Sequence, residues 1–326
     1  MTKLANTNDG TCDTDCSLRE AIDVATDGAT VTFQTGLSGT INLTSGEIVI
    51  DENTLTINAL GTSLTLDGQN TNRIFNHTGN GTLTVNSLTF QNDNAGNADG
   101  GAISSVGTSV IIESTFRNNT STINSFTPSV RGGGAIHAII SITVTNSTFT
   151  NNVAGRGGAM ASPGAITVTR SIVSGNTANE VGGGMYANGG VTIVNSLIAG
   201  NQGGRLGGGI FNRANAVLTN STISGNRADN GGGINASFGA STVTLNNSLV
   251  LGNDAPTNPQ IIAAGSITLT NSAYGFGVGE STGDTFVGLD VRDVFVDPVS
   301  AAAAPTDAGN YRLIDTSPAL DGGDNA

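Results

Sequence analysis

Tryptophan is absent from this sequence of 326 residues, aromatic residues make up 4% of it, and Lys3 is its single lysine. The net charge of −13 argues against nucleic acid as a partner, because phosphate binding needs clustered positive charge. No apolar run is long enough for a membrane-spanning helix, and the start carries no signal-peptide pattern. We therefore expect no membrane insertion by this segment, and signal or anchor segments outside it.

Cysteine is also scarce, with Cys12 and Cys16 as the only two copies. A zinc site needs four ligands, and neither His77 nor His137 lies near them in the sequence. The pair therefore favours a local disulfide bond in an oxidising compartment over a metal site. His137 is more typical of a satisfied core or surface residue than of a ligand or base, and the sequence reveals no partner for His77.

Three aspartates, Asp9, Asp13 and Asp15, surround the cysteines. Oxygen-rich spacing of this kind can hold calcium, although the twelve-residue loop with its final glutamate is missing. Calcium is thus the single cofactor that the sequence leaves open.

Carboxylates are rare in the middle of the chain, which has no aspartate from Gly100 to Ala228 and only two glutamates, Glu113 and Glu180. Glycoside hydrolysis needs two carboxylates beside one bond, and elimination on uronates needs a base beside acidic ligands or a neutralising group. We therefore favour a non-catalytic protein and keep a polysaccharide lyase or glycoside hydrolase as the alternative.

Glycine, in contrast, is abundant at 47 residues, because a repeat is written many times over. Each copy has a glycine cluster, a short alternating strand, and an apolar residue followed three positions later by asparagine. The apolar residues lie 33, 24, 25, 25 and 27 positions apart: Phe116, Phe149, Val173, Ile198, Ile223 and Val250. A period near 25 with strand-like alternation predicts the coils of a parallel β-helix.

Stacked coils turn the repeat into files of like side chains. The apolar residues then form an inward stack, and the glycines before each strand mark positive φ or close backbone approach. The asparagines predict a hydrogen-bonded ladder at a bend, with left-handed backbone tolerated there: Asn119, Asn152, Asn176, Asn201, Asn226 and Asn253.

The start of the chain predicts a cap. Ser17 and Glu20 form a capping box before a short helix, and Leu18, Ile22 and Ala25 share a face that can cover the first coil. We divide the chain into this cap (1–30), the β-helix (31–275) and an irregular, acidic C-terminal cap (276–326). Residues 120–130 read as a looped-out insertion.

The string CSLREAI at 16–22 resembles the N-terminal region of CSLREA-type secreted bacterial β-helix proteins, and SPALDGGD at 317–324 resembles the end of that group. The GGAI and FxxN pairs at 100–103 and 116–119 are similar to repeats of chlamydial polymorphic outer-membrane proteins, which are surface adhesins. These resemblances imply a right-handed, pectin-lyase-like, all-β parallel β-helix at the bacterial cell surface or outside the cell.

Charged residues recur at the coil period, as Arg131, Arg156, Glu180, Arg205 and Asp229. One interpretation is a surface ladder of ion pairs, each worth about 0–1 kcal/mol. The other is a site for an acidic glycan, with Arg131, Arg156 and Arg205 as candidate contacts. Rows of Thr-x-Thr pairs leave ice binding as a minor hypothesis.

From these patterns we expect an adhesin-like or spacer protein that presents an elongated surface to a polysaccharide or a surface protein. The alternatives are the carbohydrate-active enzyme named above and a fibre subunit that self-associates end to end.

Overall fold

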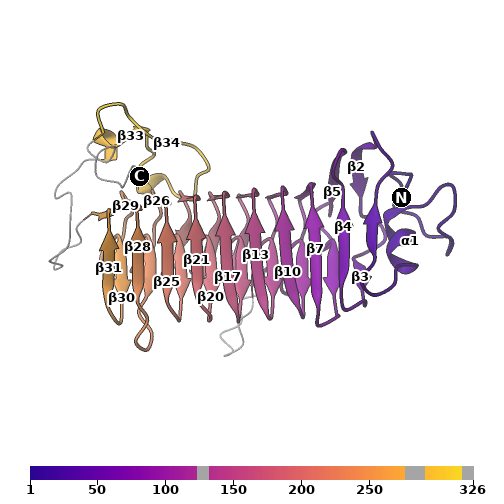
Figure 1. The fold of residues 1–326 in the computed structure, drawn as a ribbon, viewed down its shortest axis with the longest axis horizontal. Coiled ribbons are helices and arrows are strands. Elements are labelled where there is room, and N and C mark those ends of the chain that lie inside the picture. The colour runs from indigo at the N-terminus through magenta and orange to yellow at the C-terminus, as the bar shows by residue number, and fades with distance from the viewer. Residues whose placement is uncertain (123–131, 276–290, 318–326) are drawn as a thin grey trace.

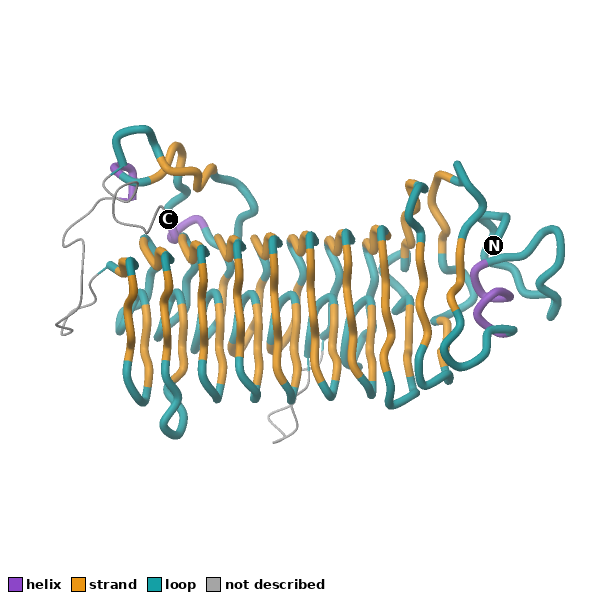
Figure 2. The backbone as a smooth tube through the Cα atoms, in the orientation of Figure 1, coloured by secondary structure: helices purple, strands orange, loops and turns teal. Residues whose placement is uncertain are grey.

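The computed structural model describes residues 1–122, 132–275 and 291–317. They form an elongated rod in which short strands stack in long parallel sheets (Figures 1 and 2). The predicted all-β parallel β-helix is confirmed, whereas its handedness stays an expectation from the resemblance. One short helix, α1 (Leu18–Asp23), lies at the N-terminal end.

Three long sheets, here named A, B and C, run the length of the rod, and a short sheet D lies between B and C in the chain order of the central coils. Sheet A contains β1 (Thr30–Thr32), β4 (Leu55–Asn58), β7 (Thr82–Asn86), β10 (Thr108–Ile112), β13 (Ser141–Thr145), β17 (Ala165–Thr169), β21 (Val191–Val194), β25 (Ala216–Thr219), β28 (Val243–Asn246) and β31 (Ile267–Thr270). Sheet B contains β2 (Ser38–Asn42), β5 (Ser63–Asp67), β8 (Leu88–Gln91), β11 (Thr115–Arg117), β14 (Thr148–Thr150), β18 (Ile172–Ser174), β22 (Leu197–Ala199), β26 (Thr222–Ser224), β29 (Leu249–Leu251) and β32 (Ala273–Tyr274).

Sheet C contains β3 (Ile48–Ile50), β6 (Phe75–His77), β9 (Ile103–Ser105), β12 (Ile136–Ala138), β16 (Met160–Ser162), β20 (Met185–Ala187), β24 (Ile210–Asn212), β27 (Ile234–Ala236) and β30 (Ile261–Ala263). Sheet D contains β15 (Val153–Arg156), β19 (Thr177–Val181) and β23 (Gln202–Gly203). Each strand pairs in parallel with the matching strand of the next coil, so side chains one period apart lie over one another.

The predicted apolar file is confirmed. Phe116, Phe149 and Val173 are register partners along sheet B, and every member of the file through Val250 is 0% exposed. Burial of each side chain contributes on the order of 1.5–3 kcal/mol. The file begins three coils earlier than predicted, because Ile41, Leu66 and Phe90 precede Phe116 in register and are each 0% exposed. The ring of Phe90 stacks on that of Phe116 with centroids 4.5 Å apart.

The asparagine ladder is confirmed as well. The backbone N–H of each ladder residue from Asn119 to Asn226 donates to the side-chain oxygen of the asparagine in the next coil, at 2.9–3.0 Å. Asp93 occupies the same position before Asn119, and the side chain of Gln260 accepts from Asn253 at the other end. The ladder residues do not have the left-handed backbone that we expected, because it belongs to the residue before each one, such as Asn151.

A second internal ladder is built from serine and was not foreseen from the sequence. Each serine N–H before the last donates to the hydroxyl of the next serine, and every one of these hydroxyls also donates to the carbonyl two residues earlier. Its members are Ser114, Ser147, Ser171, Ser196, Ser221, Ser248 and Ser272. The buried backbone at the bend between sheets A and B is thereby satisfied.

The glycine clusters act as expected at the entry to sheet C. Gly207 has a φ of +66°, which a residue with a side chain rarely adopts. At Gly208, an added Cβ would lie 2.3 Å from the carbonyl oxygen of Gly232 in the next coil. Two consecutive glycines therefore allow a left-handed turn and close stacking of backbone on backbone.

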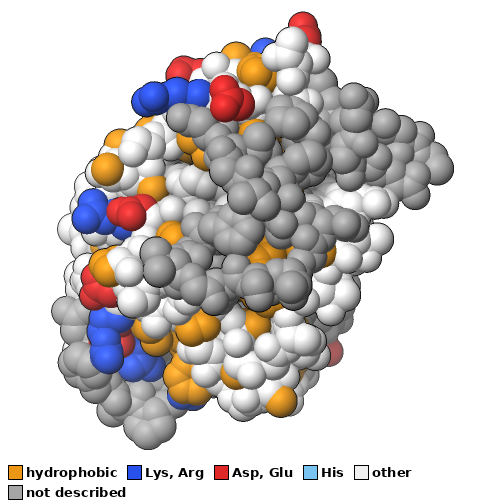
Figure 3. Space-filling view, turned by 90° about the vertical axis from the view of Figure 1, so that its left-hand side faces the viewer, with side chains coloured by type: hydrophobic (Ala, Val, Ile, Leu, Met, Phe, Trp, Pro, Cys, Tyr) orange, Lys and Arg blue, Asp and Glu red, His pale blue; other side chains and the backbone are white. Residues whose placement is uncertain are grey.

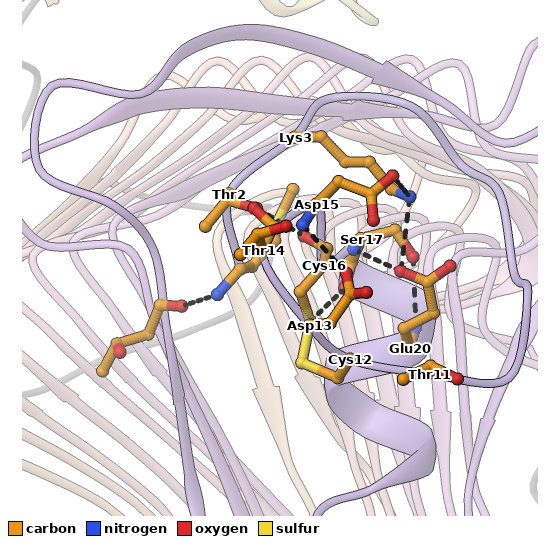
Figure 4. The surroundings of a disulfide bond; sticks show 12 residues. Thr2, Lys3, Thr11, Cys12, Asp13, Thr14, Asp15, Cys16, Ser17 and Glu20 are labelled. Carbon is orange, nitrogen blue, oxygen red and sulfur yellow. Dashed lines mark hydrogen bonds and ion pairs between the residues drawn. A yellow bond between two sulfur atoms is a disulfide. The ribbon is translucent and has the colours of Figure 1, made fainter.

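The predicted capping box and disulfide bond are both present at the N-terminal end. The Ser17 side chain accepts from the Glu20 N–H, and the Glu20 carboxylate accepts from the Ser17 N–H, which completes the capping box. Leu18 and Ile22 are each 1% exposed and join the main core. A disulfide bond links Cys12 to Cys16 in the loop before the helix (Figure 4).

The described part of the C-terminal segment folds back along the outer side of sheet B (Figure 1). It contains two 3₁₀ turns, η1 (Val291–Asp293) and η2 (Ala301–Ala303), and an antiparallel hairpin, β33 (Phe295–Asp297) and β34 (Asn310–Leu313). We call residues 291–317 the tail. Residues 276–290 of the predicted C-terminal cap lie outside the described residues, as does most of the predicted insertion at 120–130.

The tail crosses five successive coils. The Asn151 side chain donates to Asp307 at 3.1 Å, the Thr306 N–H donates to the Gly200 carbonyl at 2.9 Å, and Val291 lies against Gly252. Leu251, Val294 and Phe295 form a small core between rod and tail.

Candidate functional site

The three arginines predicted to contact a glycan differ in their surroundings. Arg131 lies outside the described residues. Arg156 ends β15, and its Nε lies 2.8 Å from Glu180 Oε2, with the two side chains 15% and 13% exposed. Arg205 is exposed and forms no ion pair within the described parts of the chain.

The predicted single file of alternating charges is wrong at its centre. A register shift between Ala154 and Arg156 pairs Arg156 with Val181, so Glu180 lies one residue out of that file. The Arg156–Glu180 ion pair still forms because the two long side chains reach across the shift. The prediction relied on the repeat period alone, and the register shift in β15 changes the pairing that the period implied.

Beside this ion pair, the outer face of sheet C carries buried aromatic side chains. Tyr186 and Phe211 are register partners on β20 and β24, and their rings stack with centroids 5.2 Å apart. Phe238 meets Phe211 edge to face at 5.5 Å and is 36% exposed. We call Tyr186, Phe211 and Phe238 the outer aromatic cluster, which Val181 flanks on the side of sheet D.

Two guanidinium groups lie over this cluster. Arg156 Cζ is 5.9 Å from the centroid of the Tyr186 ring, and Arg213 Cζ is 4.5 Å from that of Phe238, within cation–π range. Burial raises the pKa of the Tyr186 phenol, and the charges of Arg213 and Arg156 oppose that rise. The arrangement offers cationic hydrogen-bond donors beside a partly exposed ring.

Charge is unevenly distributed along the chain. From residue 100 to 228 there are seven arginines and two glutamates, a net charge of +5, although the whole chain carries −13. Viewed along the rod from its C-terminal end, charged side chains gather mostly along one side of the molecule (Figure 3). The central coils are therefore a locally basic region of an acidic protein.

The histidines are held by structural contacts or buried in the rod. His77 is 0% exposed, with Nδ1 2.7 Å from Ser105 Oγ and Nε2 3.0 Å from the Glu52 carbonyl oxygen, partners that the sequence did not reveal. His137 is 5% exposed on sheet C, in register between Ser104 and Ala161.

The aspartates of the N-terminal loop are engaged in local contacts. Asp15 pairs with Lys3 Nζ at 2.9 Å (Figure 4), and this contact lowers the pKa of that carboxyl. Asp9 and Asp13 each accept the backbone N–H of the residue two positions later. Within the described residues, no group of three or more His, Cys, Asp or Glu side chains is arranged to hold a metal ion. Calcium binding stays a prediction.

The sequence contained a signal for the outer aromatic cluster that our interpretation did not use. In the motifs GGGMY and GGGIF, Met185 and Ile210 enter the interior, so the aromatic residue that follows each must point outward. Aromatic residues at the outward position of two consecutive coils stack. Arg213 carried no such signal, because its turn differs from coil to coil.

Comparison with known protein families, curated proteins and solved structures finds no match for this chain. The resemblances to CSLREA-type and chlamydial surface proteins therefore remain predictions, and the structure establishes the β-solenoid alone. None of the helices in the described residues is long and apolar enough to cross a membrane.

Proposed function

We propose that this chain is a non-catalytic bacterial rod, extracellular or on the cell surface, that contacts an acidic polysaccharide through the outer face of sheets C and D. The observation that carries the proposal is the outer aromatic cluster with Arg156 and Arg213 over its rings. The Cys12–Cys16 disulfide supports an oxidising location.

The chemistry of this face suits a polymer of charged sugars. A guanidinium group can donate two parallel hydrogen bonds to a carboxylate, and it does so at lower desolvation cost than an ammonium group. The exposed part of Phe238 offers a flat apolar surface to the C–H face of a sugar ring. The local excess of positive charge in the central coils attracts an acidic polymer at short range. Repulsion of the polymer by the acidic ends of the chain is screened by salt beyond about 8 Å.

Affinity electrophoresis tests the proposal directly. We expect alginate, a polymer of uronates, to retard the full chain, and neutral mannan to leave its mobility unchanged. The double variant Arg156→Gln/Arg213→Gln should weaken retardation about tenfold, a loss of about 1.4 kcal/mol, and Arg205→Gln should weaken it less.

Arg117→Gln is the matched control, because Arg117 is an exposed arginine on sheet B that contacts the Gln91 amide. Thermal melts must show that every variant folds. Equal retardation of the parent and the double variant, or none by alginate at all, would refute the proposal.

A further inference from the structure

A groove of about 770 Å³ separates the tail from the rod on the side of sheet B. Its rod wall is the bend between sheets A and B, and its tail wall is the start of β34. The lining residues are Arg170, Ser171, Ile172, Asn195, Ser196, Leu197, Asn220, Thr222, Gly309, Asn310, Tyr311 and Arg312. The set contains two arginines and no carboxylate.

The rod wall presents one polar side chain per coil. Arg170, Asn195 and Asn220 all have left-handed backbone, with φ of 47°, 50° and 49°. Arg170 Nε donates to Asn146 Oδ1 at 2.8 Å, and the Asn220 amide donates to Asn195 Oδ1 at 3.1 Å. Among the residues that the structure describes, no hydrogen bond joins Arg170 to Asn195, and none is formed by the terminal nitrogens of Arg170 or the amide nitrogen of Asn195. These groups keep donors for a ligand.

The tail wall supplies the second cation. Arg312 is exposed and, within the described residues, forms no ion pair. Next to it, Tyr311 packs edge to face on Phe295 at 5.6 Å and lies against Gly225 of the rod. These contacts hold the wall in place.

The lining indicates the class of ligand. Two arginines without a carboxylate partner favour an anion with separate carboxylates, and the amides and hydroxyls favour a hydroxylated one. A peptide would depend on apolar pockets for alternate side chains, and Ile172 and Leu197 are the only aliphatic side chains in the lining. Successive coils repeat this wall every 4.8 Å or so, which suits a ligand with repeating units.

We propose that this groove binds a short uronate oligosaccharide, with Arg170 and Arg312 each holding a carboxylate. The site is separate from the outer aromatic cluster, and it rests on the proposed function only for the class of polymer. Binding is expected to weaken as salt rises, since both main contacts are ionic.

Isothermal titration of the full chain with mannuronate trimer is the test, and mannotriose is the matched neutral ligand. We expect the uronate trimer to bind, mannotriose not to bind, and Arg170→Gln/Arg312→Gln to lose at least tenfold in affinity. Arg170→Lys in place of Arg170→Gln should recover part of the lost affinity, because lysine restores the charge but cannot donate two parallel hydrogen bonds to a carboxylate. Arg117→Gln should bind normally.

The outcomes separate the two proposals. If the trimer binding is lost in Arg156→Gln/Arg213→Gln and kept in Arg170→Gln/Arg312→Gln, the groove is not the site, and the proposed function stands. If alginate fails to retard the chain but the trimer binds through Arg170 and Arg312, the proposed function fails and the groove stands. Absence of trimer binding, or tighter binding of a polyglutamate peptide at the groove, overturns the groove proposal.

Discussion

The coils beneath the tail and the coils before it differ at one turn position. Ahead of the ladder residue, the coils before the tail have asparagine with positive φ, at Asn92 and Asn118, and so does the first coil beneath the tail, where the Asn151 side chain donates to Asp307. In the next four coils beneath the tail the same left-handed position is glycine, at Gly175, Gly200, Gly225 and Gly252. A Cβ at Gly200 would lie 2.1 Å from the Thr306 carbonyl oxygen. The left-handed turn accepts either residue, but the backbone of the tail lies too close for a side chain at Gly175 and Gly200.

The comparison separates what the coil requires from what the neighbourhood requires. The asparagine and serine ladders continue through both regions, because each rung bonds only within its own coil and to the adjacent coils. The outer turn residue varies with what lies over it. The interior sets the repeat, and the exterior is free to differ from coil to coil.

The largest expected effect breaks what both regions share. Asn201→Ala removes the acceptor of the Asn176 N–H and side-chain amide, which lie 3.0 and 2.9 Å from it, and the donor to the Val173 carbonyl. Buried groups left unpaired cost about 1–3 kcal/mol each, so we expect a loss of about 3–5 kcal/mol in chemical denaturation.

Thr192→Ala, on the exposed side of β21 in the same coil, is the control and should change stability by less than about 0.5 kcal/mol. Similar losses in the two variants would contradict the role given to the ladder.

The next effect repairs the ladder before the tail. Burial raises the pKa of Asp93 well above its usual range, and its Oδ2 has no hydrogen-bond partner. A raised pKa in the folded state means that stability is full below the unfolded pKa of about 3.9 and falls as pH rises through the folded value. Asp93→Asn should therefore stabilise the protein at pH 7 by about 1–3 kcal/mol.

The gain should shrink toward pH 3, where the parent carboxyl is protonated in both states, and urea denaturation at the two pH values measures it. A variant that is less stable than the parent at pH 7 would show that the Asp93 charge is needed.

The smallest effect on global stability tests the turn itself. Gly200→Asn keeps a residue that tolerates the left-handed turn but forces its side chain into the Thr306 backbone, so the tail should separate from the rod. Limited proteolysis and amide exchange should detect faster cleavage and exchange in residues 291–317, with the rod unchanged. Asn118→Gly, in a coil before the tail, is the reverse control. Unchanged protection of the tail in Gly200→Asn would refute the proposed constraint.

The part of the fold that sequence predicts best is the part that repeats. The pair formed by Phe116 and Asn119 recurs in each later coil as an apolar residue followed three positions on by asparagine, so both files could be predicted directly from the sequence. The serine ladder escaped notice because the residue before it changes from Glu113 to Asn146 to Arg170, and a varied context hides a constant serine. Phe90 does not match the repeat motif, because the residue three positions after it is Asp93 and not asparagine.

The candidate sites were less accessible to sequence. The repeat period identified Arg156 as a candidate. The register shift that moves Glu180 out of line with it is a local irregularity of the strand, and no residue type in the sequence marks it. The groove depends on Arg170 meeting Arg312, and contacts between residues so far apart are set by how the tail folds back. Periodicity describes neighbours in the stack and contains no information on such a return.

The tail also fixes how many coils this rod can have beneath it. A solenoid can be lengthened by duplicating a repeat, because a new coil meets its neighbours as the old one did. Between Asn151 and Gly252, however, the tail contacts each coil at a set place, so one more turn there would pull Asp307 and Val291 out of step with their partners. Duplication of a repeat is therefore tolerated on the amino-terminal side of Asn151, whereas the length of the tail sets the number of coils between Asn151 and Gly252.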